Sequence, residues 1–400
     1  MKKPLSNKLD KISPSMTLAI TSKANKLKRE GVKVYSFGTG EPDFDTPQVI
    51  IDAANEAMKK GITRYTDVKG LIDLRIAVSE KYKKEFNLDY DPESEIIVSS
   101  GAKHSLFTAL QALISEGDEV IIPVPYWVSY SEMVKVAGGK PVFVYPKKEN
   151  NFILTKEELE AVITPKSKVI MLNNPSNPTG VVYTKEQLKE VADVCVKEGI
   201  YILSDEIYEM LIYNDKEFTP VASLSDEIKD ITITINGASK SYAMTGWRIG
   251  YALANKDIVK AMNTIQGQCV SHPSSISQYA TITALKTDQK IVYDMVKEYD
   301  SRRKYMLSVL KEVDGVEPIE PDGAFYVFAD VSKYYGKEYN GKQINGSIDF
   351  ADALLSSKNV AVIPGIGFGA DDFIRFSYAT SMEDIESGLK LFKEFINEIK

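Results

Sequence analysis

The chain has 400 residues, of which 44% are hydrophobic and 26% are charged, and its formal net charge is -7. This composition is typical of a globular protein that is long enough to bury a large core, in about two domains. The acidic balance argues against nucleic acid or an anionic membrane as a partner, because both require a basic protein face. We therefore expect any cationic site to be local.

Cysteine, histidine and apolar runs exclude several further classes. Cys195 and Cys269 lack the spacing of a metal site or a disulfide framework, and we expect both to be buried thiols. With so few cysteines, His104 and His272 cannot complete a zinc centre, so we expect no metal. No signal-peptide core follows the N-terminus, and no apolar run is long enough to cross a bilayer. These features predict a cytoplasmic protein.

Short apolar runs alternate with amphipathic stretches between residues 95 and 255. This rhythm is typical of an α/β fold in which a mainly parallel sheet carries helices on both faces. We expect seven strands and, among the helices, three over 105–115, 185–197 and 258–265. The strands are expected at 95–99, 120–123, 141–144, 169–172, 201–203, 231–235 and 249–252. Motifs that follow these strands matter most, because ligands gather at the carboxyl ends of such strands.

A long charged helix is expected over residues 289–313, where it could lead into a second, smaller α/β domain. We place an N-terminal arm and part of the small domain at 1–48, a large domain at 49–292 and the small C-terminal domain at 293–400. The N-terminal segment is expected either to join the small domain or to reach across to a partner.

Two glycine-rich segments imitate nucleotide-binding motifs. Gly336 to Lys342 has the spacing of a phosphate loop, but Gln343 stands where a Ser or Thr must bind magnesium. Gly365 to Gly369 lacks the dinucleotide spacing and is better interpreted as a tight loop. A nicotinamide dehydrogenase is disfavoured for the same reason.

The segment after the strand at 231–235 holds the most informative residue. Lys240 is expected at the carboxyl edge of the sheet, where partial burial would lower its pKa and free it as a nucleophile. Arg248 is suited to bind a phosphate or a carboxylate through two hydrogen bonds. A single lysine near a strand end is usually a solvated surface residue, so the neighbouring motifs decide between the two interpretations.

Three other motifs supply an amide loop, an acid and a phosphate cradle. Asn173 to Gly180 is a loop made rigid by its prolines. Asp205 ends a strand with Tyr208 expected on the same helical face, and this acid could keep a heteroaromatic nitrogen protonated. The alternative is that Ser204 or Asp205 simply caps a helix. The turn Ser100-Gly101-Ala102 leads a strand into a helix, whose free N–H groups would hold a phosphate.

Together these motifs resemble the fold-type I pyridoxal-phosphate aminotransferases of class I, and most closely the bacterial subgroup of aspartate aminotransferases. The resemblance spans nearly the whole chain, from Pro14–Thr17 and Gly38–Phe44 through Pro125–Tyr130 to Ile374–Thr380. It implies a homodimeric transaminase with pyridoxal 5'-phosphate as cofactor. The implied reaction moves the amino group of aspartate to 2-oxoglutarate, giving oxaloacetate and glutamate, by a ping-pong mechanism.

The resemblance also implies roles for the matching residues. Lys240 would bind the cofactor's aldehyde, Asp205 would pair with the ring nitrogen, and these two form the implied catalytic set with Tyr208. Asn177 and Tyr208 would bond the ring's 3-oxygen beneath Trp127, which lies over the ring. Arg375 would grip the substrate's α-carboxylate next to Gly40. The implied phosphate contacts are Ser100, Gly101, Ala102, Ser239, Arg248 and, from the other subunit, Tyr65.

Two departures from the better-known relatives bear on the phosphate contacts and on substrate choice. Gly237 replaces a serine that helps to hold the phosphate, and the segment 269–275 lacks an arginine for the substrate's side-chain carboxylate. In the bacterial subgroup a lysine takes that role, and Lys103 matches it, with Ser15 and Thr17 as hydroxyl partners. A plain surface lysine is the alternative interpretation of Lys103.

Other activities of the same scaffold stay open at this stage. They include aromatic, alanine or prephenate transaminases and a lyase. Prephenate is disfavoured by Ser13, where relatives that use it often carry a basic residue. A cofactor-sensing transcription regulator would need a DNA-binding module ahead of this domain, yet Pro14 already belongs to the aminotransferase pattern.

Overall fold

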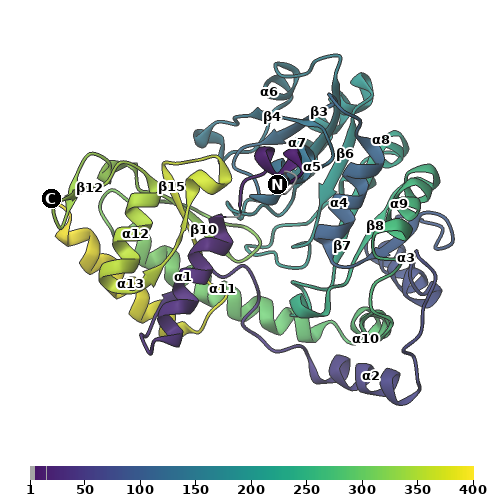
Figure 1. The fold of residues 1–400 in the computed structure, drawn as a ribbon, viewed down its shortest axis with the longest axis horizontal. Helices are drawn as coiled ribbons and strands as arrows, with labels where there is room; N and C mark the ends of the chain where they lie inside the picture. Colours follow the sequence, from purple (N-terminus) through teal and green to yellow (C-terminus); the bar gives the residue numbers. More distant parts are fainter. Residues whose placement is uncertain (1–4, 15) are drawn as a thin grey trace, which may run out of the picture.

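The computed structural model describes residues 5–14 and 16–400 and shows two parts, each built on a β-sheet. Helix α11 (Lys290–Lys311) runs along both parts as one continuous helix (Figure 1). The predicted domain boundaries at residues 48 and 292 stay a prediction.

The large sheet contains seven strands, as predicted. Its order is β2-β8-β7-β6-β5-β3-β4, and only β8 runs antiparallel to its neighbours among these strands. The strands are β2 (Ile96–Ser99), β3 (Glu119–Pro123), β4 (Lys140–Val144), β5 (Ser167–Asn173), β6 (Tyr201–Asp205), β7 (Thr232–Gly237) and β8 (Gly250–Leu253). The mainly parallel α/β sheet is thereby confirmed.

Both faces of this sheet are buried, which explains why its strands are almost continuously apolar. Along β6, Ile202 packs into a cluster with α7 (Lys185–Glu198), whereas Leu203 packs on the opposite face with α4 (Ala102–Leu113). Successive strand side chains point to opposite faces, so each face receives every second residue. The remaining helices of this part are α2 (Gln48–Lys59), α3 (Ile72–Phe86), α5 (Ser129–Val136), α6 (Lys156–Glu160), α8 (Asp226–Ile231), α9 (Lys256–Cys269) and α10 (Ser275–Lys286).

The small sheet is antiparallel, in the order β14-β15-β10-β9. The N-terminal segment joins this part, because β1 (Tyr35–Ser36) pairs with β13 (Val360–Ala361) and α1 (Met16–Arg29) contacts β13. The other elements are β9 (Glu317–Ile319), β10 (Tyr326–Asp330), β11 (Glu338–Tyr339), β12 (Lys342–Gln343), β14 (Ile363–Pro364), β15 (Phe373–Ser377), α12 (Ser347–Lys358) and α13 (Met382–Glu398).

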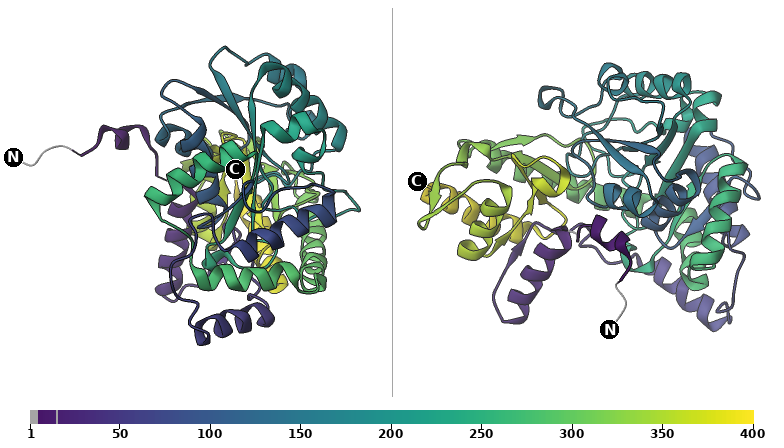
Figure 2. Two further views of the ribbon diagram at one scale, coloured as in Figure 1. Left: turned by 90° about the vertical axis from the view of Figure 1, so that its right-hand side faces the viewer. Right: turned by 45° about the horizontal axis from the view of Figure 1, so that its top comes forward.

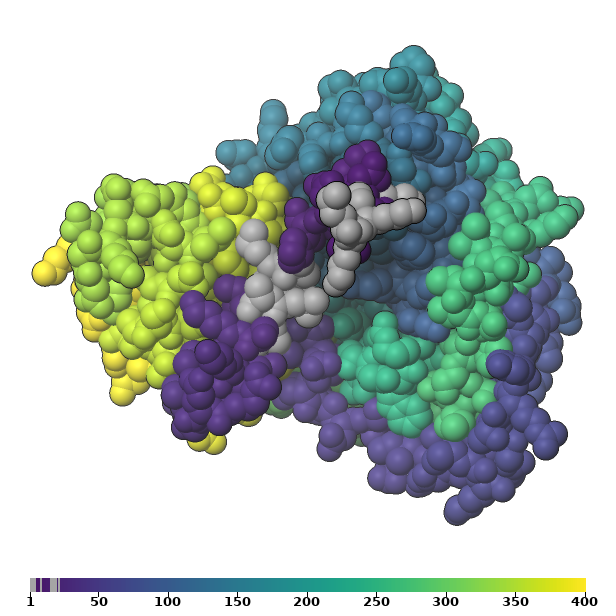
Figure 3. Space-filling model, viewed as in Figure 1, coloured from purple at the N-terminus to yellow at the C-terminus, as the bar shows by residue number. Residues whose placement is uncertain are grey.

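Short 3-10 helices connect these elements at η1 (Asn7–Lys11), η2 (Lys148–Asn150), η3 (Val221–Ser223), η4 (Thr245–Trp247), η5 (Ser332–Tyr334) and η6 (Gly365–Phe368). η1 stands away from the body of the molecule in the left view of Figure 2. In Figure 3 the purple N-terminal segment crosses the face between the two parts.

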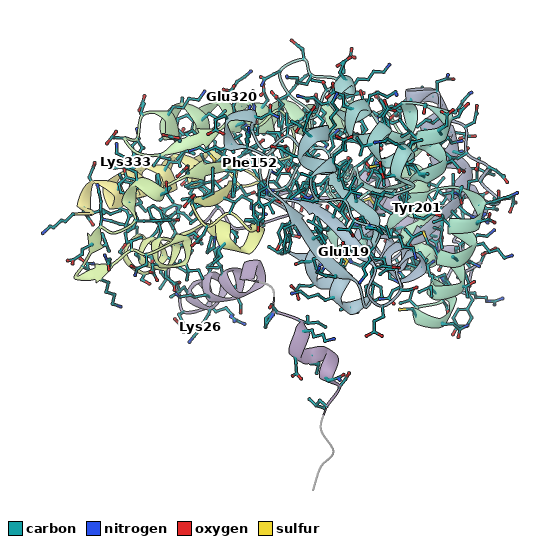
Figure 4. The ribbon with its side chains drawn as sticks, turned by 90° about the horizontal axis from the view of Figure 1, so that it is seen from above. Lys26, Glu119, Phe152, Tyr201, Glu320 and Lys333 are labelled. Atoms are coloured by element: carbon teal, nitrogen blue, oxygen red, sulfur yellow. The ribbon has the colours of Figure 1, made fainter. Side chains whose placement is uncertain are left out.

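Aromatic and ionic contacts join the two parts near η2. The ring of Phe152 meets that of Phe373 edge-on at 5.4 Å, at the junction visible in Figure 4. Nζ of Lys148 lies 2.8 Å from a carboxylate oxygen of Glu317 and 2.5 Å from one of Asp330. These contacts hold the small sheet against the large one.

Two expectations from the sequence are wrong. Cys269 is exposed, because it lies at the last turn of α9, whereas Cys195 is buried as expected. The residues after Asp205 form turns and not a helix, because the chain is drawn into a bridge between Ile212 and Gly323. Asp205 and Ser204 therefore cap no helix. The long helix predicted at 289–313 is confirmed within two residues at either end.

Within the described residues, no helix is both long and apolar enough to cross a membrane. In the same part of the chain, no group of three or more His, Cys, Asp and Glu side chains could hold a metal ion.

Helix α7 offers a matched test of the packing described above. Val191 is fully buried against the large sheet, whereas Val196, on the same helix, is 37% exposed. Val191→Ala should lower the free energy of unfolding by about 2 kcal/mol, because it removes two buried methyl groups. Val196→Ala should change it by less than about 0.5 kcal/mol. Urea unfolding of the apoprotein measures both, and equal effects would contradict this packing.

Candidate active site

A cavity of about 450 Å³ lies at the carboxyl ends of the large sheet's strands, where the small sheet faces them. We call it the central cavity. It brings together eleven of the residues predicted from the sequence, which come from segments spread between residues 40 and 375. They are Gly40, Ala102, Lys103, Trp127, Asn177, Asp205, Tyr208, Ser239, Lys240, Arg248 and Arg375.

Lys240 follows β7 through a short turn and extends its amine into the central cavity. Its Nζ donates a hydrogen bond to the carbonyl oxygen of Gly40 at 2.6 Å. Burial lowers the pKa of Lys240 to about 8, and the nearby charges of Arg375 and Arg248 act in the same direction while Glu41 opposes them. A substantial fraction of this amine is therefore neutral near pH 8 and can act as a nucleophile.

Asp205 ends β6 and is almost completely buried. Tyr130, from α5, donates a hydrogen bond to its carboxylate at 2.6 Å. Burial raises the pKa of Asp205 to about 6, although the bond from Tyr130 and the charge of Lys240 pull it down. Among the described residues no cation forms an ion pair with this acid, so a cationic group in the cavity would find its partner there.

The amide loop after β5 is rigid because its own side chains bind its backbone. The Asn173 side chain accepts a hydrogen bond from the backbone N–H of Asn177 at 2.7 Å. The Asn177 side-chain oxygen accepts one from Arg375 at 2.9 Å. Tyr208 and Tyr326 join their hydroxyl groups at 2.9 Å, so loop, turn and small sheet meet around one wall of the cavity.

The turn before α4 forms a backbone cradle. Gly101 has a φ of +89°, and a Cβ there would lie 2.3 Å from Nη2 of Arg248, so only glycine fits. Nη1 of Arg248 donates a hydrogen bond to the carbonyl oxygen of Thr245 at 2.8 Å. Its Nη2 lies beside the turn that precedes α4, near the carbonyl oxygen of Ser100. The first turn of a helix and a guanidinium thus face the same space, an arrangement that suits a phosphate.

Arg375, on β15, is buried, and the described residues offer its guanidinium only neutral oxygens. Besides Asn177, its partner is the carbonyl oxygen of Gly38 at 3.1 Å, and its Nε has no hydrogen-bond partner among the residues that the structure describes. No ion pair links it to a carboxylate anywhere in residues 5–14 and 16–400. A buried arginine without a counter-ion is a binding site for a carboxylate.

Lys103, in the first turn of α4, provides a second cation at the cavity. Its amine lies 4.7 Å from the ring centre of Trp127. Burial lowers the pKa of Lys103, and Arg248 adds to this effect. No carboxylate pairs with it in the part of the chain that the structure describes, and it lines both the central cavity and a wider cavity beside it.

Besides Gly101 of the cradle, four predicted residues do not line the central cavity or lie, in whole or in part, outside what the structure describes. Tyr65 is 91% exposed, contacts His272 edge-on at 5.6 Å and does not line the central cavity. Ser15 and the side chain of Thr17 lie outside the described residues. Ser100 lines the wider cavity next to Lys103.

Sequence reasoning assigned no role to three residues that shape the cavity. Tyr130 holds Asp205, Tyr326 holds Tyr208, and Glu41 accepts a hydrogen bond from Thr245 at 2.8 Å. Tyr130 lies in the Pro125–Tyr130 motif, but Asp205, the acid to which it donates, is 75 residues away in the chain. No local signal could have predicted these pairs, because they form only when distant segments meet.

These groups fit pyridoxal phosphate. A lysine with a lowered pKa would take the aldehyde, an acid without a cationic partner would take the ring nitrogen, and the Gly101 cradle with Arg248 would take the phosphate. Each requirement is met by a side chain or backbone group of the site. Within the described chain, contacts with other residues leave each of these groups at least partly free to bind a ligand.

The comparisons with known proteins agree with this site. The family model for aminotransferase class I and II matches residues 32–392. An aspartate aminotransferase of Bacillus sp. (strain YM-2) is 48% identical over 397 residues, which cover 99% of this chain and 100% of the relative.

Two solved structures share the fold over the full length. The aspartate aminotransferase of Rhizobium meliloti superimposes with a TM-score of 0.96 at 39% identity, covering 100% of each chain. That of Thermus thermophilus with maleate gives a TM-score of 0.92 at 39% identity, covering 98% of this chain and 100% of that one. Together these findings confirm the predicted fold type and the predicted kind of enzyme. The chain therefore belongs to the aminotransferase class I and II family and is a transaminase that depends on pyridoxal phosphate.

Proposed function

We propose that this enzyme moves the amino group of aspartate to 2-oxoglutarate, giving oxaloacetate and glutamate, in a ping-pong sequence. The observation that carries the substrate choice is a pair of cations, Arg375 and Lys103, that line one cavity and form no ion pair with a carboxylate in the described chain. A dicarboxylic substrate would supply one anion to each. The relative named as an aspartate aminotransferase and the neighbour solved with maleate support this assignment.

When bound, pyridoxal phosphate supplies an aldehyde for the amino group and a ring that withdraws electrons from the substrate's α carbon. We assign Asp205, held by Tyr130, to keep the ring nitrogen protonated. Lys240 would hold the aldehyde at rest and, once displaced by the substrate's amine, use its Nζ to remove the proton from the α carbon. A pKa near 8 suits that amine to both accept and return a proton.

The other predicted residues would orient the reacting groups. Asn177 and Tyr208 would bond the ring's oxygen, and Trp127 would cover the ring and keep water away. Arg375 would hold the α-carboxylate next to Gly40. The assigned phosphate contacts are Ser100, Gly101, Ala102, Ser239 and Arg248.

We also propose a homodimer, because Tyr65 does not reach the cavity of its own chain. Its exposed ring would complete the phosphate contacts of a second copy. Ser15 and Thr17 remain proposed partners of the substrate's side chain.

The first test fixes the cofactor's position. Borohydride reduction of the cofactor-loaded enzyme, followed by peptide mapping, should place the label on Lys240, because its amine is the one with a lowered pKa beside Asp205. Lys240→Ala, treated in the same way, should carry no label. A label on another lysine, or none in protein saturated with the aldehyde, would refute the proposed chemistry.

The second test concerns the substrate. Lys103→Ala should lower kcat/KM for aspartate about a hundredfold, since a charged hydrogen bond to the side-chain carboxylate is lost. Its kcat/KM for alanine should change less than about threefold, because alanine has no such carboxylate.

Lys260→Ala, which removes an exposed lysine of α9, serves as the control for Lys103→Ala. Equal losses with aspartate and alanine would remove the specificity argument. A panel of amino donors, read from the cofactor's own spectrum, would then identify an aromatic or alanine transaminase instead.

The third test concerns the shared site. Lys240→Ala lacks the reactive amine and Tyr65→Ala lacks the phosphate contact, so each variant alone should be weakly active. Refolding an equal mixture should restore about a quarter of wild-type activity, because hybrid dimers contain one intact site. Light scattering checks the dimer. Hybrids that form but stay inactive would contradict the assignment of Tyr65.

A further inference from the structure

A buried ion pair lies next to the turn that carries Asp205 and Tyr208 but outside the central cavity. Nζ of Lys81, on α3, lies 3.0 Å from a carboxylate oxygen of Glu209, and both side chains are at least 95% buried. Glu85, one turn further along α3, also pairs with Lys81. None of the three lines the central cavity.

Burying these charges is costly, so removing one partner would leave the other as an uncompensated buried charge. Burial alone would lower the pKa of Lys81, but Glu209 and Glu85 outweigh it and hold that pKa above its ordinary value. The charged groups that face Lys81 are thus Glu85 from its own helix and Glu209 from the turn after β6, with the phenol of Tyr242 nearby. The amine stays charged and fixed between two elements.

Glu209 belongs to the turn that carries two of the proposed active-site residues. Asp205 and Tyr208 of this turn point into the central cavity, whereas Glu209 points to α3. The N–H of Glu209 donates to the carbonyl oxygen of Glu206 at 3.0 Å, so its backbone is part of the same turn. A shift of Glu209 would therefore move Tyr208 and Asp205.

The same cluster reaches the segment before Lys240. Asn236, at the end of β7, donates a hydrogen bond to Tyr82, the neighbour of Lys81 on α3, at 3.2 Å. The Asn236 side-chain oxygen accepts from the N–H of Gly237, which opens the turn to Lys240. One helix thus binds both strand ends from which the proposed acid and the proposed nucleophile project.

We propose that the Lys81–Glu209 ion pair is a positioning element of the active site. Through it, α3 fixes the turn of Asp205 and Tyr208 relative to the strand end that precedes Lys240. This inference rests on the proposed roles of Asp205 and Lys240. Neither Lys81 nor Glu209 touches the reacting groups, so their effect must appear in the geometry around the cofactor.

The test uses Lys81→Met, Glu209→Gln and the double variant of the full-length enzyme. Two quantities are measured: the pH midpoint of the bound cofactor's absorbance change, and the cofactor concentration that half-saturates the apoprotein. Each single variant should shift the midpoint by about half a pH unit or more and raise the half-saturation concentration about tenfold. The double variant should lose no more than the single ones, because all remove the same pair.

Lys83→Met is the matched control, since Lys83 lies on the same helix and forms an exposed pair with Asp89 at 2.6 Å. It should leave both quantities unchanged. If Lys81→Met does not fold, Glu209→Gln, which keeps the size and shape of the side chain, decides the question.

Two results would overturn the positioning role. One is a lower unfolding temperature with an unchanged pH midpoint and unchanged cofactor binding, which marks a purely structural pair. The other is additive losses in the double variant. A wild-type protein that shows no absorbance change with pyridoxal phosphate would instead refute the proposed function itself.

Discussion

Strands β5, β6 and β7 run parallel and in register, so their carboxyl ends meet at one edge of the large sheet. Asn173 lies opposite Asp205, and Asp205 lies opposite Ile235, whose strand leads into the turn of Lys240. The register of these strands therefore brings the amide loop, the acid and the lysine together at this edge. The other residues of the site are arranged around this edge, and Arg375 and Tyr326 reach it from the small sheet.

The edge is useful because it is buried on several sides at once. Helices cover both faces of the sheet, and the small sheet brings Arg375 and Tyr326 over its open end. Burial explains the opposite pKa shifts of Lys240 and Asp205, since a low dielectric disfavours the charged form of each. Burial thus explains both why the amine of Lys240 is partly neutral near pH 8 and why the carboxylate of Asp205 is stabilised by a nearby cation.

The charged groups of the central cavity differ from most of the other buried charges in lacking ion-pair partners within the described chain. Arg375 and Lys103 bring positive charge into the cavity without a carboxylate partner in the described chain, and Asp205 brings negative charge without a cation. The Lys81–Glu209 pair differs because it is complete in itself and lies outside the cavity. A buried charge without a partner is costly until a ligand neutralises it, whereas the charges of a complete pair neutralise each other.

The local sequence pattern was enough to predict the seven strands, the positions of Lys240 and Asp205 at their ends, and the glycine turn before α4. These features are local: burial on both faces makes a strand continuously apolar, and only glycine accepts the backbone of residue 101. The expectation of a helix after Asp205 was wrong. A bridge between Ile212 and the distant Gly323 overrides the local preference for a helix.

Which side chains face each other depends on how distant segments pack in the folded chain. The bonds from Tyr130 to Asp205 and from Arg375 to Asn177 join residues 75 and 198 positions apart. The burial that shifts the pKa of Lys240 likewise comes from segments that no local pattern links to it. The position of a residue in the sequence pattern predicts which edge of the sheet it lies at. The distances between side chains across a cavity depend instead on how separate elements pack.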